Sequence, residues 1–155
     1  MILKLNSRNS MKSVLVLAVI LAGCAATPRL YLQYGKDLKQ SDLERVLAEN
    51  PLGGAENIKI TPLGRGQGVS HHIVQIRDRE IPHIHKFHDG TVVMFRGHGF
   101  LMMENHKIDL AHGDVVHIPR GVVHYFVNTG NAPAVAFVVF SPPFDGKDVI
   151  PVKIP

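Results

Sequence analysis

Two closely spaced turns between residues 113 and 128 constrain the fold of this chain more than any other feature. Gly113-Asp114 follows an apolar segment and predicts a turn into a strand over Val115–Ile118. Pro119-Arg120-Gly121 predicts a second turn, because Pro fixes φ and Gly allows positive φ. The chain then enters another strand over Val123–Val127. Short strands separated by tight turns indicate a β-sandwich or a β-barrel.

The same pattern covers most of the chain from residue 57 onward. The other expected strands are Ile58–Leu63, Val69–Arg77, Thr91–Arg96, Gly99–Glu104, Lys107–Leu110 and Val135–Phe140. Before them, Ser41 and Glu44 form a capping-box pattern, which predicts a short helix that ends at Asn50-Pro51. Residues 26–39 are polar and predict an irregular tether. We therefore expect an all-β fold with one short N-terminal helix.

Three histidines stand where this pattern can bring them together. His83 and His85 are two residues apart, so on a strand they project from one face, roughly 6.5–7 Å apart along it. His124 becomes a third neighbour if the sheet closes on itself. A single such histidine is most simply a core residue, but three of them predict a metal site.

Residues 113–128 resemble the second motif of the cupin family, G-x5-P-x-G-x2-H-x3-N. Every fixed position is filled: Gly113, Pro119, Gly121, His124 and Asn128. The family's first motif, G-x5-H-x-H-x3-4-E-x6-G, is matched by His83, His85 and Gly97, whereas Arg77 replaces its leading Gly and its Glu is absent. The resemblance implies a jelly-roll β-barrel.

The missing Glu leaves the fourth metal ligand open. Counting back from Gly97 puts the Glu at Gly90, which has no side chain, whereas counting on from His85 gives Asp89. His88 is the other candidate, because it shares the strand parity of position 90. We favour Asp89, although a carboxylate there could also serve only to cap a turn.

The resemblance implies that His83, His85, His124 and Asp89 hold one divalent transition metal, which can be Fe, Mn, Ni, Co, Cu or Zn. Cupins of this size include dioxygenases, lyases and isomerases, so we expect a small mononuclear metalloenzyme that acts on a small molecule. The alternative is a non-enzymatic periplasmic module that binds a metal or a small ligand. The sequence identifies no catalytic acid or base.

Three further residues are candidates for the substrate pocket. Phe126 shares a strand face with His124, and the surrounding strands are rich in apolar residues. Gln75 and Arg77 share a face of their strand and could hold a substrate carboxylate. The other interpretation of Gln75 and Arg77, which we favour, is that they are solvated.

The N-terminus has the features of an export signal. Lys12 precedes an apolar run over Val14–Leu21 that is too short to span a bilayer as a helix. Leu21-Ala22-Gly23-Cys24 resembles the bacterial lipobox, which implies a lipid on Cys24, the only cysteine. Ala25 stands where an Asp would retain the protein at the inner membrane, which favours the outer membrane, with the protein on the periplasmic side of the envelope.

These features divide the chain into four parts. They are a signal peptide (1–23), a lipid-anchored tether with the short helix (24–54), the cupin barrel (55–150) and a tail (151–155). An extended tail of this kind often packs against a partner subunit, so a homodimer is expected.

Composition restricts the partners. The chain is 45% hydrophobic and 19% charged, which is typical of a globular protein. Of its 17 Lys and Arg residues, three precede Cys24, which leaves 14 against 13 acidic residues. No basic stripe with interleaved aromatic residues remains, so nucleic-acid binding is not expected.

Overall fold

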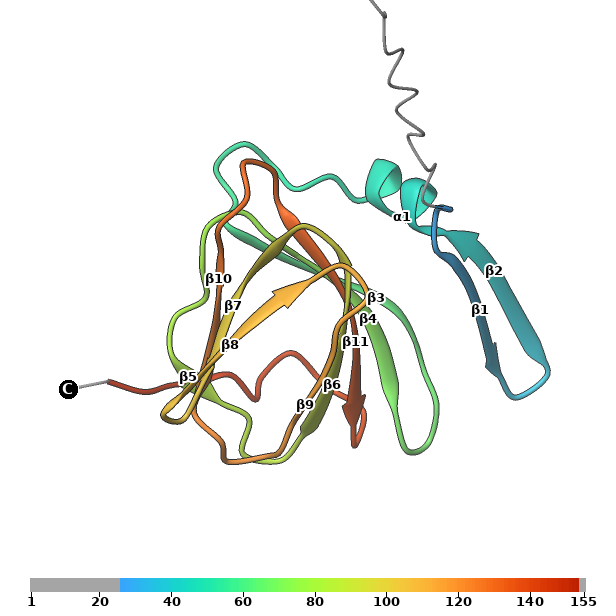
Figure 1. Cartoon of the computed structure of the whole chain (residues 1–155). Coiled ribbons are helices and arrows are strands. Elements are labelled where there is room, and N and C mark those ends of the chain that lie inside the picture. Colours follow the sequence, from blue (N-terminus) through green and yellow to red (C-terminus); the bar gives the residue numbers. More distant parts are fainter. Residues whose placement is uncertain (1–25, 154–155) are drawn as a thin grey trace, which may run out of the picture.

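The computed structural model describes residues 26–153, and most of its strands form two five-stranded antiparallel sheets that face each other (Figure 1). One sheet has the order β12-β5-β10-β7-β8 and the other has the order β3-β4-β11-β6-β9. The elements are β1 (Arg29–Tyr34), β2 (Asp37–Asp42), α1 (Leu43–Glu49), β3 (Ile58–Arg65), β4 (Ser70–Ile76), β5 (His83–Ile84), β6 (Asp89–Arg96), β7 (His98–Met103), β8 (His106–Ala111), β9 (Val115–Ile118), β10 (His124–Asn128), β11 (Ala134–Ser141) and β12 (Ile150–Pro151). This is the predicted jelly-roll barrel with one short helix.

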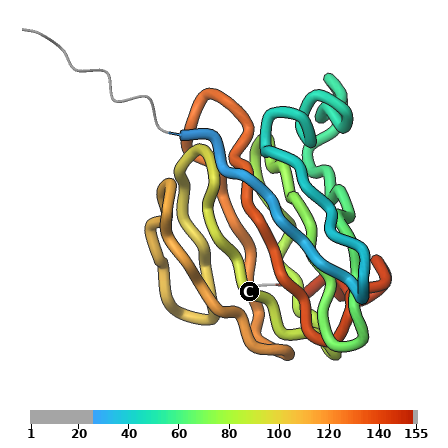
Figure 2. The backbone as a smooth tube through the Cα atoms, turned by 90° about the vertical axis from the view of Figure 1, so that its right-hand side faces the viewer, coloured from blue at the N-terminus to red at the C-terminus, as the bar shows by residue number. Residues whose placement is uncertain are grey.

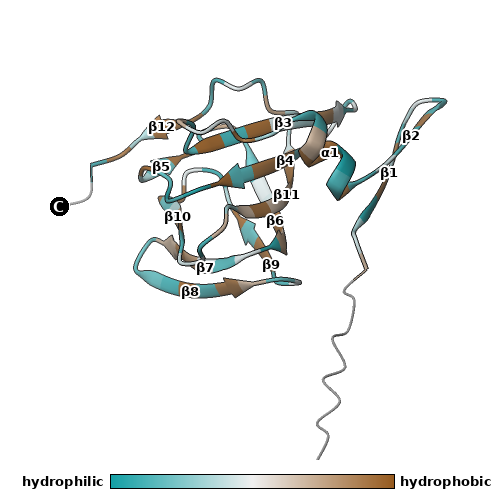
Figure 3. Ribbon diagram, turned by 90° about the horizontal axis from the view of Figure 1, so that it is seen from above, coloured by the Kyte–Doolittle hydropathy of each residue, from teal (hydrophilic) through white to brown (hydrophobic). Residues whose placement is uncertain are grey.

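The main core lies between the two sheets. It is built from inward-facing side chains of both, among them Ile76, Met94, Leu101 and Phe126. The apolar segments of the strands are visible from above the barrel (Figure 3). Alternation along each strand, with one side chain in and the next out, is what allows these short segments to enclose a core.

The strand that follows the predicted second turn lies beside the strand that carries His83. β10 is placed between β5 and β7, and His124 is directly opposite His83. The turn before β10 is tied to the residues after β5, because the backbone N–H of Gly121 donates to the carbonyl of His85 over 2.7 Å. Gly121 has φ +80°, which a residue with a side chain rarely adopts.

The N-terminal part of the described chain differs from the prediction. Residues 29–42 form a regular hairpin of β1 and β2 instead of an irregular tether. The hairpin and α1 cover the outer face of the second sheet (Figure 2), where Leu30 and Leu43 pack with Ile73 and Val135 in a second core. The N-cap of α1 is Asp42 and not Ser41, since the Asp42 carboxylate accepts from the N–H of Arg45.

The C-terminal segment also carries more structure than predicted. β12 pairs with β5, with Pro151 opposite His83, so the segment closes one edge of the barrel. The predicted signal peptide (1–23), Cys24 with its predicted lipid, and the last two residues lie outside the described residues. Within residues 26–153, no helix is long and apolar enough to cross a membrane.

Candidate metal centre

Three buried histidines converge at one end of the barrel interior. His83 lies on β5, His85 follows it directly, and His124 opens β10. One ring nitrogen from each histidine lies within 4.8 Å of the others. The ring centroids of His83 and His124 are 4.3 Å apart, and that of His85 is 5.0 Å from His83 and 5.3 Å from His124. The structure thus brings together the three histidines that the sequence singled out.

Each of these rings is oriented by a backbone carbonyl. The Nδ1 atom of His83 lies 2.8 Å from the oxygen of Ile81, and that of His124 lies 2.9 Å from the oxygen of Val122. The Nδ1 atom of His85 lies 2.5 Å from the oxygen of Asp148. A carbonyl oxygen only accepts, so each Nδ1 carries the hydrogen and each Nε2 keeps its lone pair. This is the arrangement that prepares histidine for a metal ion.

Burial keeps two of these rings, those of His85 and His124, neutral. It lowers the pKa of His124 to about 4, helped by the nearby charge of His83. Burial also lowers the pKa of His85, and the hydrogen bond to Asp148 opposes this effect. Both imidazoles are therefore deprotonated at neutral pH, as metal ligation requires.

Neither candidate for the fourth ligand joins the cluster. Asp89 binds Arg120, with Oδ2 2.5 Å from one guanidinium nitrogen and Oδ1 2.9 Å from the backbone N–H. These hydrogen bonds hold the pKa of Asp89 well below its usual range. His88 donates to Asp148, with 2.6 Å between the two atoms. Gly90 lines the cavity, so the position that carries the family's carboxylate faces inward but has no side chain.

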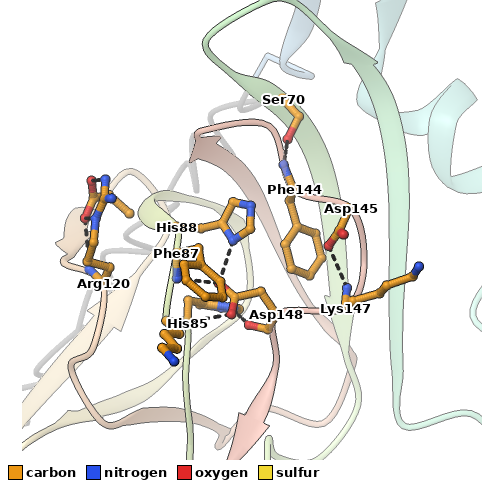
Figure 4. A network of polar contacts seen from close by, with 11 residues as sticks. Ser70, His85, Phe87, His88, Arg120, Phe144, Asp145, Lys147 and Asp148 are labelled. Carbon is orange, nitrogen blue, oxygen red and sulfur yellow. Dashed lines mark hydrogen bonds and ion pairs between the residues drawn. The ribbon is translucent and has the colours of Figure 1, made fainter.

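Asp148, which contacts His85 and His88, is a residue of the site that the sequence did not identify (Figure 4). Its carboxylate accepts from the backbone N–H groups of Lys86 and Phe87 and from His88, while its carbonyl accepts from His85. Burial acts to raise the pKa of Asp148, but the hydrogen bonds from His88, Phe87 and Lys86 outweigh it and lower that pKa. Its contacts are about sixty residues away in sequence, and no local pattern could have predicted them.

The histidines open into a cavity of about 310 Å³ inside the barrel. Its wall is apolar and includes Phe126, as predicted from the strand face that this residue shares with His124. Gln75 and Arg77 are not among its lining residues. The Gln75 amide donates to the carbonyl of Asn50, and Arg77 donates to the carbonyls of Gly53 and Glu56, on the outer side of the second sheet.

Glu80 is a second residue that the sequence did not identify. It lines the cavity, and its carboxylate accepts from the backbone N–H of Phe126 over 2.9 Å. Burial raises the pKa of Glu80, against the opposing effects of His83 and of the Phe126 N–H. The residue precedes His83 by three positions, at a variable position of the first motif.

The donor set fits a transition metal. Three neutral imidazoles with anchored Nδ1–H groups form one face of a coordination sphere and leave room for exchangeable ligands. The adjoining cavity can admit a small molecule to such a position. No carboxylate of the described residues joins the three ligand atoms, so the protein offers an all-histidine set.

Comparison with known proteins agrees with this geometry. The family model described as "Cupin domain" matches residues 70–140. An uncharacterized protein of Aquifex aeolicus is 36% identical over 119 residues, which cover 77% of this chain and 95% of that protein.

Solved structures share the fold at low identity. KdgF from Halomonas sp. superimposes with a TM-score of 0.56 at 23% identity, over 63% of this chain and 93% of its own. Pac13 from Streptomyces, described as a nucleoside dehydratase, has a TM-score of 0.54 at 16% identity, over 63% of this chain and 80% of its own.

Proposed function

The family model described as a cupin domain matches residues 70–140 of this chain, and on that premise we propose that the chain is a small mononuclear metalloenzyme. His83, His85 and His124 hold one divalent transition metal, and the substrate is a small molecule that enters the adjoining cavity. The reaction belongs to the oxygenase, lyase or isomerase type.

One observation carries this proposal. Each of the three imidazoles has its Nδ1 held by a backbone carbonyl, which leaves three Nε2 lone pairs available at one buried point. A structural core histidine needs no such convergence with two others. An apolar cavity next to the ligand atoms then supports binding of a substrate, beyond storage of a metal.

The bound metal would act as a Lewis acid or, if it is iron, as a centre that activates oxygen. The protein's own contribution is to orient three neutral ligands and to keep bulk water away with the apolar wall. No phosphate-binding Gly-rich loop or Lys cluster lines the described cavity, which argues against phosphoryl transfer.

The test is metal analysis followed by turnover. Protein purified without added metal, and protein reloaded with iron, manganese, nickel or zinc, is incubated with a pool of small metabolites, and products are compared by mass spectrometry. His83→Ala should lose both the metal and any product, whereas His106→Ala, which removes an exposed histidine, should lose neither. Metal-dependent ligand binding without product in any form would reject the enzyme and support the binding-module alternative.

We also propose that Cys24 carries a lipid that anchors the barrel on the periplasmic side of the bacterial envelope, with the outer membrane favoured. The lipobox-like sequence supports this, and the first strand of the fold begins at Arg29, five residues after Cys24. A lipid at Cys24 would therefore hold the barrel close to the membrane surface.

A further inference from the structure

The cavity next to the three histidines is lined by an acidic group but, within residues 26–153, by no Lys or Arg. Among the described residues that line it, Glu80 is the only ionisable group besides the histidines, and no Lys or Arg is present. The remaining wall is aliphatic or aromatic, as at Val92, Ile118 and Phe140. A ligand bound here therefore meets a metal site, an apolar wall and a single acidic group.

Glu80 is held in place at one oxygen. Its backbone N–H donates to the carbonyl of Phe126, and its Oε2 atom accepts from the N–H of the same residue, 2.9 Å in each case. No described residue donates to the other carboxyl oxygen. Phe126 is two residues from His124 on β10, and His124 is directly opposite His83, so the pairing with Phe126 places Glu80 on the side of the cavity that carries the histidines. An oriented side chain with an unused acceptor at the edge of an apolar cavity is a recognition element.

The same arrangement is unfavourable for anionic ligands. A small carboxylate usually needs a cationic or N–H-rich partner when it leaves water. Arg77, the nearest candidate from the sequence, donates to carbonyls on the outer side of the sheet instead. A ligand carboxylate inside the cavity would meet another acidic group and no cation apart from the metal.

We infer that Glu80 determines the ligand specificity of this cavity, because its unused carboxyl oxygen accepts a hydrogen bond from the ligand. The ligand class is a small, mostly apolar, uncharged molecule that presents a hydroxyl donor beside its metal-binding oxygen, such as an α-hydroxy ketone. Carboxylates of the same size are disfavoured. This inference rests on the proposed metal site, and it narrows the substrate class of that site.

Two probes of matched shape test this inference. 2-Hydroxyacetophenone carries a carbonyl, a neighbouring hydroxyl and an apolar ring, and phenylglyoxylate replaces the hydroxymethyl group with a carboxylate. The protein is loaded with zinc, because zinc has no redox chemistry of its own, and is titrated with each probe by calorimetry. The variant Glu80→Gln keeps an oxygen for the Phe126 N–H but turns the other atom into a donor. Glu49→Gln is the control, because it removes an exposed carboxylate from α1.

Wild-type protein and Glu49→Gln should bind 2-hydroxyacetophenone more tightly than phenylglyoxylate. Glu80→Gln should lose roughly tenfold to a hundredfold in affinity for the hydroxy ketone, because an amide donor replaces the acceptor oxygen and leaves the ligand hydroxyl without a partner. The same variant should bind phenylglyoxylate more tightly than wild type does. If Glu80→Gln does not fold, Glu80→Ala should still lose the preference for the hydroxy ketone.

Metal content separates the possible failures. Glu80→Gln should retain the wild-type amount of zinc. Loss of zinc from Glu80→Gln would make Glu80 a metal ligand and overturn the inference while leaving the metal site standing. Equal binding of both probes by wild type, no binding of either, or unchanged selectivity in Glu80→Gln would also overturn the inference. Full zinc retention by His124→Ala would instead remove the proposed function itself.

Discussion

At the scale of single residues, the backbone carbonyls of Ile81, Val122 and Asp148 determine what the histidines can do. Each accepts the Nδ1–H of one ring, so the three Nε2 atoms are acceptors before any ligand arrives. Burial lowers the pKa of His85 and His124, so these two rings do not take up a proton near neutral pH. The neutral state of His124 therefore makes the folded protein less stable at low pH.

The stability of metal-free protein should therefore depend on pH in one direction. The pKa of His124 is about 4 in the folded state and near 6.5 in the unfolded chain, so the unfolded chain binds the proton first as pH falls. Stability from this group is complete above about pH 6.5 and is lost down to about pH 4, by roughly 3 kcal/mol at most. Urea unfolding in EDTA at several pH values should show this slope, and His124→Gln should flatten it. An equal slope in both proteins would contradict the buried neutral histidine.

The histidines could be predicted from the sequence, and their partners could not. Residues two apart on a strand share a face, so His83 and His85 had to point the same way. Asp89 and Gly90 differ by one residue and therefore face opposite sides, and Gly90 is the one that lines the cavity. The contacts of Asp148 and Glu80 depend on pairings between distant segments, which no local pattern contains.

At the scale of elements, strand β4 shows why the alternation of its side chains does not predict which of them line the cavity. Its side chains alternate as expected, and Val74 and Ile76 line the cavity while Gln75 lies on the opposite face. Both faces of β4 are buried, because the hairpin and α1 cover the outer one. Alternation therefore separates two sets of residues without showing which set is interior. The turns and most strand bounds, in contrast, followed directly from Gly, Pro and apolar runs.

The C-terminal segment is predicted to support the metal site through Asp148. Asp148→Asn replaces one carboxylate oxygen by an amide nitrogen that cannot accept, so either the bond from Lys86 to Oδ1 or the bonds from Phe87 and His88 to Oδ2 are lost. Loss of such an outer contact typically weakens a metal site tenfold to a hundredfold, and we expect this range for zinc affinity measured by competition with a chelator. Asp145→Asn, which changes a neighbouring exposed aspartate, should leave affinity unchanged. Equal affinities of the two variants would show that the Asp148 carboxylate has no role in the site.

Close approach of β7 and β10 is predicted to exclude any side chain at Gly99. A Cβ there would lie 2.1 Å from the carbonyl oxygen of Val127 and 2.6 Å from the ring of Phe126. Gly99→Ala should therefore cost about 1–3 kcal/mol of unfolding free energy, as overpacked cores do. Gly54→Ala is the control, since a Cβ there meets nothing within 4 Å. Urea unfolding at pH 7 measures both, and a neutral Gly99→Ala would contradict the described strand pairing.

At the scale of the whole molecule, the fold consists of a barrel with a layer of hairpin and helix on one outer face. The N-terminal hairpin begins within a few residues of Cys24, and β12 closes the barrel edge next to the metal site. The expected tail thus packs on its own barrel through β5.

The lipid anchor makes a separate prediction about location. Cys24→Ser should remove the only thiol available for lipidation. The variant should then appear in the soluble periplasmic fraction without label after growth with a radioactive fatty acid, while wild type is labelled and sediments with membranes. Unlabelled wild-type protein found entirely in the soluble fraction would contradict the lipoprotein hypothesis.

The most direct test of the central claim is thermal unfolding with and without a chelator, for wild type and His124→Ala. A metal that binds only the folded state stabilises it by about 2.7 kcal/mol at a hundredfold excess over Kd. Chelation should therefore lower the Tm of metal-loaded wild type and leave the Tm of His124→Ala unchanged, with Asp89→Ala responding as wild type does. An equal shift, or no shift, in wild type and His124→Ala would contradict a metal site formed by His83, His85 and His124.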